Sequence, residues 1–138
     1  ALVHFPTNGY FTQKTITGVK EIMKMKPPKL IIPVSLDGDE ETNDEVRGKK
    51  GGWKKQIDTF RQLQEIKGVE VVLGMTLSKH NAGKYQQTFE AVKKVLPNLN
   101  DRDFHVNVAH ESGHFYNNSS NELTDNSSNE LISRELKQ

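Results

Sequence analysis

Polar residues at the end of an apolar run could form a binding site. The run 30–36 is apolar except for Ser35, and Asp37 follows it directly. Ser35 and Asp37 are two positions apart, so on a strand their side chains project to the same side. A hydroxyl and a carboxylate placed there could bind ribose hydroxyls or an amino group. Arg47 ends the mostly polar stretch that follows, and its guanidinium could hold a carboxylate through two parallel hydrogen bonds.

The same residues also have a purely structural interpretation. Asp37 and Gly38 form a frequent turn pair, and Asp44 with Arg47 has the spacing of an ion pair within a helix. Spacing alone leaves both interpretations open.

A second candidate site is the H-E-x-x-H pattern from His110 to His114. On a helix, these two histidines would share one face and could bind zinc, with Glu111 as the general base and Glu122 or Glu130 as a third ligand. The pattern follows a strand directly, and the polar residues after it offer no apolar helix face. A polar loop is therefore preferred, with a zinc metallopeptidase as an alternative. The other histidines, His4, His80 and His105, are scattered and are predicted to be structural or at a sheet edge.

The elements that must position these residues alternate between strand and helix. Apolar patterns predict strands over 2–5, 30–36, 69–77 and 104–108, and helices over 12–26, 53–66 and 85–96. Strand–helix alternation indicates right-handed βαβ units and a parallel sheet. The strands end in polar or glycine-rich residues, which would meet at one edge of that sheet, where ligands bind in such folds. Pro33 would remove one hydrogen bond from its strand, and Gly74 suggests a close approach by a ligand or backbone.

Composition limits the possible functions. The 138 residues fit one domain, and a net charge of +1 gives no electrostatic basis for binding nucleic acid or an anionic membrane. The absence of cysteine excludes disulfides, thiolate zinc sites and cysteine-bound iron–sulfur clusters from these residues. No apolar stretch is long enough to span a bilayer, and no signal peptide is visible, so a cytoplasmic location is predicted. The chain begins inside a strand-like run, which suggests a fragment of a longer protein.

The last residues differ from the rest in composition. The stretch 118–123 recurs at 126–131, and such polar repeats cannot bury a face. We therefore expect a main domain over 1–116 and a polar tail over 117–138, with room for one short terminal helix.

Several short motifs, taken in order, resemble the radical S-adenosylmethionine superfamily, and within it the peptide- and protein-maturing enzymes that carry a SPASM domain. The resemblance covers residues 2 to about 117. Its motifs are Thr7-Asn8-Gly9, Ser35-Leu36-Asp37-Gly38, Asn43 to Gly48, Gly52-Trp53, Thr76-Leu77 with Asn81, and Phe104 to Val108 with Ser112 and Phe115-Tyr116.

The resemblance implies an α/β fold in which about four parallel strands form part of a (β/α)6 partial TIM barrel, similar to its strands three to six. It further implies that Ser35 contacts S-adenosylmethionine and that Arg47 holds the cofactor's carboxylate. The other cofactor-binding residues that it implies are Asn8, Asp37, and the backbone at Thr76 and Leu77.

The chain departs from the family pattern in one major way. The C-x3-C-x2-C loop that binds the [4Fe–4S] cluster is missing, together with the first two strands and the cysteine-rich accessory domain. We therefore expect the cofactor-binding portion of a radical oxidoreductase that modifies a peptide or protein, inactive by itself. The alternative is a noncatalytic binding or structural fragment, whose exposed sheet edges would favour self-association.

Overall fold

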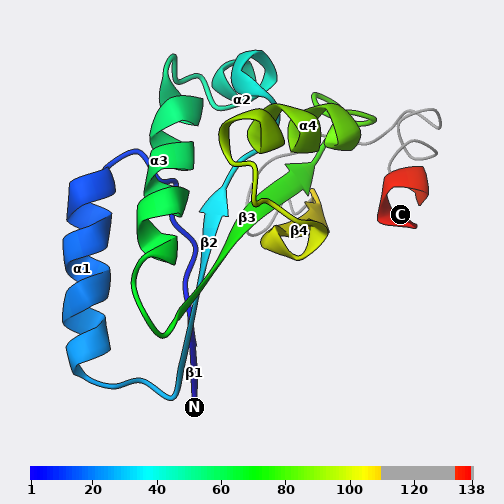
Figure 1. Ribbon diagram of the computed structural model, residues 1–138. Coiled ribbons are helices and arrows are strands. Elements are labelled where there is room, and N and C mark those ends of the chain that lie inside the picture. Colours follow the sequence, from blue (N-terminus) through cyan, green and yellow to red (C-terminus); the bar gives the residue numbers. More distant parts are fainter. Residues whose placement is uncertain (110–132, 138) are drawn as a thin grey trace, which may run out of the picture.

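The computed structural model describes residues 1–109 and 133–137, which form an α/β fold around a curled, half-barrel sheet (Figure 1). The sheet has four parallel strands in the order β1-β2-β3-β4. This confirms the predicted fold class. The elements are β1 (Leu2–His4), α1 (Thr12–Lys24), β2 (Lys29–Ser35), α2 (Glu40–Val46), α3 (Gly52–Gln64), β3 (Val69–Leu77), α4 (Tyr85–Val95), a short 3-10 helix (Asp101–Asp103) and β4 (Phe104–Val108).

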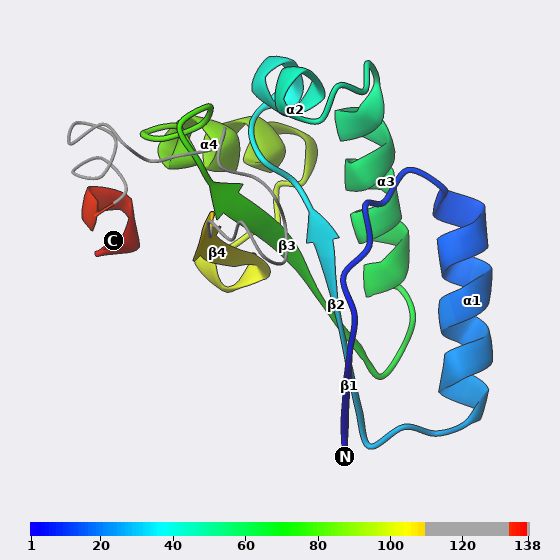
Figure 2. The same ribbon diagram turned by 180° about the vertical axis from the view of Figure 1, so that it is seen from behind.

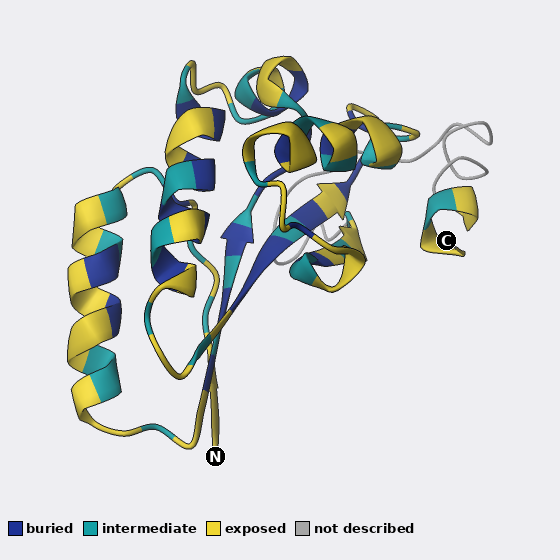
Figure 3. Ribbon diagram, in the orientation of Figure 1, coloured by how far each residue is buried: buried dark blue, intermediate teal, exposed yellow. Residues whose placement is uncertain are grey.

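The core lies between the convex face of the sheet and the helices α1, α3 and α4. Along β2, buried residues alternate with neighbours that are exposed or partly exposed, and the ribbon coloured by burial shows this band of buried positions in β2 and β3 (Figure 3). Figure 2 shows the sheet from the side away from these helices. The buried apolar residues at the centre of this core are Val19, Leu30, Ile32, Val34, Phe60, Leu63, Leu73, Met75, Leu77 and Val92. One face of the sheet is thus covered by these helices, and within residues 1–109 and 133–137 no helix packs on the other.

Pro33 lies inside β2, a central strand, and its position explains how the sheet tolerates it. Ser35 N donates to Thr7 O on the β1 side, so the backbone nitrogen two residues earlier also faces β1. The bond that Pro33 lacks therefore falls on the β1 side. There β1 ends at His4, and the pairing resumes only as an isolated bridge between Thr7 and Val34.

Helix α2 was not predicted. Its seven residues carry no apolar periodicity, which is why a search for a hydrophobic stripe misses it. Asp39 caps its first turn by accepting a hydrogen bond from Thr42 N at 3.0 Å, and Glu40 and Glu41 follow in that turn. These N-terminal signals were present in the sequence.

The described C-terminal residues lie beside the start of α4. Residues 133–136 form a helical turn, and Glu135 Oε1 accepts a hydrogen bond of 2.7 Å from Tyr85 N at the start of α4. No helix in residues 1–109 or 133–137 has the length and apolar character to cross a membrane.

Candidate functional site

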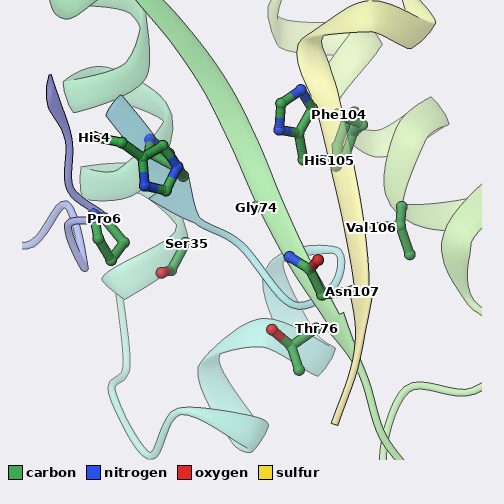
Figure 4. Close-up of a pocket in the computed structure, with 10 residues that line it drawn as sticks. His4, Pro6, Ser35, Gly74, Thr76, Phe104, His105, Val106 and Asn107 are labelled. Carbon is green, nitrogen blue, oxygen red and sulfur yellow. The ribbon is translucent and has the colours of Figure 1, made fainter. Parts of the chain in front are cut away.

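A pocket of about 640 Å³ lies on the concave face of the sheet, among side chains from all four strands and the β1 end (Figure 4). Strand pairing places Ser35, Gly74 and His105 side by side across three strands, with Thr76 beside Asn107 in the next row. The remaining lining residues are His4, Pro6, Pro33, Phe104 and Val106.

Gly74 keeps the middle of this pocket open. It lies between Ser35 and His105, so a side chain there would project into the pocket. A Cβ atom built on Gly74 would meet Pro33 Cβ at 3.5 Å, an ordinary van der Waals contact. The glycine is therefore not required by the backbone, and its effect is the space that it leaves.

Several polar side chains in the pocket have no partner among the described residues. Within residues 1–109 and 133–137, the hydroxyls of Ser35 and Thr76, the His105 ring and the Asn107 amide make no hydrogen bond. They offer donors and acceptors suited to hydroxyls and to a nitrogen heterocycle, on a partly apolar floor.

Asp37 joins several elements at the upper edge of the pocket. Its Oδ1 atom accepts a hydrogen bond of 2.9 Å from Thr76 N on β3, and its Oδ2 atom pairs with Arg47 Nη2 at 2.6 Å. Its backbone N–H donates to Asn43 Oδ1 at 2.9 Å, and its backbone oxygen accepts from Asn81 Nδ2 at 2.8 Å. The residue is 7% exposed. Asp37 is thus held through both its backbone and its side chain.

Gly38 allows this arrangement to form. A Cβ atom at Gly38 would lie 2.6 Å from Thr42 Cβ in the first turn of α2, so a larger residue would push the helix away. Trp53 Nε1 also donates to Gly38 O at 3.2 Å. The chain bends at Gly38, directly after Asp37, and α2 approaches the sheet there.

Arg47 follows the last residue of α2, and only 21% of its side chain is exposed. Asp37 satisfies one of its nitrogens, whereas its Nε atom is buried without a hydrogen-bond partner. The structure thus pairs Arg47 with Asp37 and not with Asp44, whose carboxylate accepts from Gly51 N at 2.5 Å and Trp53 N at 2.9 Å at the start of α3.

Two buried side chains, Asn43 and Gln56, form a chain of hydrogen bonds next to Asp37 that was not predicted from the sequence. Asn43 Nδ2 donates to Gln56 Oε1 at 2.7 Å, and Gln56 Nε2 donates to Ser35 O at 2.6 Å. Both side chains are fully buried. A signal existed, because Gln56 lies three residues after Trp53 and four before Phe60, on the apolar face of α3.

Asp39 is the acidic group at the site with a perturbed pKa. Burial raises the pKa, but hydrogen bonds from the Gln87 side chain and from Thr42 outweigh it, with a smaller contribution from Lys84, so the pKa lies below 3.8. Asp39 therefore remains a carboxylate at neutral pH, as its role at the N-terminus of α2 requires.

The structure brings together most of the predicted site residues. Ser35 and Thr76 line the pocket, and Asp37 and Arg47 are joined to Thr76 at its edge. Asn8 is exposed and does not line the pocket. Its Oδ1 atom accepts a hydrogen bond of 3.1 Å from Tyr10 N.

The remaining predicted residues have other surroundings. The Leu77 side chain is fully buried in the core, so only its backbone could reach a ligand. His4 and His105 lie on the outer strands, as predicted, but also line the pocket, which was not predicted. His110 and His114 lie outside the described residues. No group of three or more metal-binding side chains occurs in the part of the chain that is described.

Comparison with known proteins gives one partial match. The chain is 34% identical over 59 residues to the sporulation killing factor maturation protein SkfB of Bacillus subtilis (strain 168). The matched segment is 43% of this chain and 14% of SkfB, so the chain spans a small part of that relative's length. No family model matches. The match supports a relation to the radical S-adenosylmethionine superfamily and nothing narrower.

Proposed function

We propose that this chain is the S-adenosylmethionine-binding portion of a radical enzyme that modifies a peptide or protein. The observation that carries the proposal is that Ser35 and Thr76 line one concave pocket, and that Thr76 N donates to Asp37, which pairs with Arg47. The partial match to a protein that matures a killing factor supports the same assignment. The substrate peptide or protein, and any self-association through β1 and β4, remain predictions.

The residues present fit the cofactor. S-adenosylmethionine carries a carboxylate, an amino group, ribose hydroxyls and an adenine ring. Arg47 has a buried Nε atom without a partner, which is consistent with a site for an anion. Ser35 and Thr76 provide hydroxyls for a sugar, and Asn107 and His105 provide groups for a heterocycle.

The residues present do not fit the [4Fe–4S] cluster. The 138 residues contain no cysteine, and such clusters are held by cysteine thiolates. Cluster chemistry must therefore come from a different segment or chain, and this chain alone is expected to be inactive. The bound cofactor would supply the radical chemistry, while Ser35, Thr76 and Arg47 would bind and orient it.

Isothermal titration calorimetry of the 138-residue chain with S-adenosylmethionine tests the proposal. We expect saturable binding, which Arg47→Ala weakens by roughly tenfold or more because a charged hydrogen bond is worth about 1.5–3 kcal/mol. Arg61→Ala is the matched control, because Arg61 also pairs with an aspartate at 2.6 Å but is well exposed on α3. Absence of binding, or equal loss in both variants, would contradict the proposal and favour a noncatalytic fragment.

A further inference from the structure

We propose that Asp37 is a positioning residue, which orients Arg47 for the ligand carboxylate and does not itself contact the ligand. This inference rests on the proposed cofactor site and refines it, since sequence resemblance placed Asp37 among the cofactor-binding residues.

The carboxylate of Asp37 is buried and has a protein partner on each oxygen, which disfavours a direct contact with the ligand. Each carboxylate oxygen already has a partner, Thr76 N for Oδ1 and Arg47 Nη2 for Oδ2. The backbone of Asp37 is held by Asn43 and Asn81, and its side chain could turn toward the pocket only by releasing Thr76 N and Arg47. Asp37 also does not line the pocket, whereas its partner Thr76 does. A ligand amino group would therefore have to reach a carboxylate that is buried outside the pocket lining and already paired at both oxygens.

Arg47, in contrast, retains donors. Asp37 occupies Nη2, whereas Nε is buried without a partner, and Nη1 makes no hydrogen bond to any residue that the structure describes. An unpaired buried donor is costly, and a carboxylate is the partner that a guanidinium binds best. The guanidinium is thus fixed at one nitrogen and incomplete at the others.

The position of Arg47 in the chain explains why it needs this support. It is the residue that ends the seven-residue helix α2, and a long flexible side chain loses rotational freedom on binding. The Asp37 contact restricts that freedom before the ligand arrives. Because Asp37 also bonds to Thr76 N, the orientation of Arg47 is tied to β3, which contributes Gly74 and Thr76 to the pocket.

Binding of two ligands separates positioning from direct contact. Decarboxylated S-adenosylmethionine keeps the amino group and lacks the carboxylate. If Asp37 acts through Arg47, Asp37→Asn weakens S-adenosylmethionine by roughly tenfold or more, the worth of one charged hydrogen bond, and changes the decarboxylated ligand by less than about twofold. The double variant Asp37→Asn/Arg47→Ala then binds no more weakly than Arg47→Ala. Partial unfolding of a variant would weaken both ligands equally, so binding is compared only for variants whose far-UV circular dichroism matches that of the wild type.

Equal weakening of both ligands in Asp37→Asn, or independent additive losses in the double variant, would show that Asp37 contacts the ligand and would overturn the inference.

Arginine side-chain NMR without ligand provides the second measurement. We expect Asp37→Asn to shift the Arg47 Nε–H signal and to speed rotation of its guanidinium, because the negative charge that pairs with that group is lost. Asp58→Asn is the control, since Asp58 pairs with the exposed Arg61 and should leave Arg47 unchanged. If the wild-type chain binds neither ligand, the proposed function fails, and an Arg47 signal that still depends on Asp37 supports the positioning role. An Arg47 signal unaffected by Asp37→Asn refutes that role whether or not the ligand binds.

Discussion

Asn43→Ala should destabilise the protein strongly, although Asn43 lies on a short polar helix. Its side chain accepts a hydrogen bond of 2.9 Å from Asp37 N and donates one of 2.7 Å to Gln56 Oε1. Asn43 and Gln56 are both fully buried. Alanine would therefore leave a buried donor and a buried acceptor without partners and without access to water.

The size of the effect follows from these two groups. A buried polar group left unsatisfied costs about 1–3 kcal/mol, so two such groups give roughly 2–4 kcal/mol for Asn43→Ala after some relaxation. That is a large part of the ~5–15 kcal/mol by which small domains are stable. The loss should also loosen the end of β2, because the Asn43–Gln56 chain leads to Ser35 O.

Urea unfolding followed by circular dichroism measures this loss. Asn98→Ala is the matched control, because Asn98 is exposed and its side chain makes no hydrogen bond to any described residue; its cost should stay within ~0.5 kcal/mol. If Asn43→Ala costs no more than Asn98→Ala, the buried chain does not stabilise the fold, and our account of how α2 holds Asp37 is wrong.

Three further predictions test the pocket, a helix cap and a carboxylate. Gly74→Val should keep the fold, since a Cβ atom there meets nothing closer than 3.5 Å. Its side chain should fill the pocket and weaken S-adenosylmethionine binding, measured by calorimetry, by roughly tenfold. The control is Gly18→Ala on α1, where a Cβ atom has open space; it should leave binding unchanged and stabilise the protein by about 0.5–1 kcal/mol. Asp44→Ala should cost about 1–2 kcal/mol in urea unfolding, because Asp44 accepts two backbone hydrogen bonds at the start of α3. Because folding lowers the pKa of Asp39, its carboxylate stabilises the protein above pH 3.8, and this contribution is lost as the pH falls through the pKa of the folded state. The difference in unfolding free energy between wild type and Asp39→Asn should therefore shrink below pH 3.8. A difference that stays constant with pH would contradict the lowered pKa.

Much of the fold could be predicted because its signals are local. Apolar runs bounded by turns located β2, β3 and β4, and helical spacing located α1, α3 and α4. The strand–helix alternation then implied the parallel order of the sheet. Helix α2 escaped because its stability comes from Asp39, from the first-turn acids and from burial of Asn43, none of which produces an apolar stripe.

The site was predictable in its members but not in its contacts. Polar strand ends identified Ser35, Asp37 and Thr76, since parallel strands bring those ends together. Nothing in the spacing indicated that Arg47 pairs with Asp37 instead of Asp44, because that choice depends on how α2 packs on Gly38. His105 could have been found from its alternation with apolar residues on β4, given that the concave face is open.

Backbone amide NMR during a titration with S-adenosylmethionine tests most directly whether the cofactor binds in the concave pocket. We predict that the largest changes in amide chemical shift occur at residues that line the concave pocket, namely Ser35, Gly74, Thr76 and Asn107. The chemical shifts of the α1 amides, on the convex side, should not change. Shift changes confined to the helical side, or none at millimolar ligand, would contradict the account.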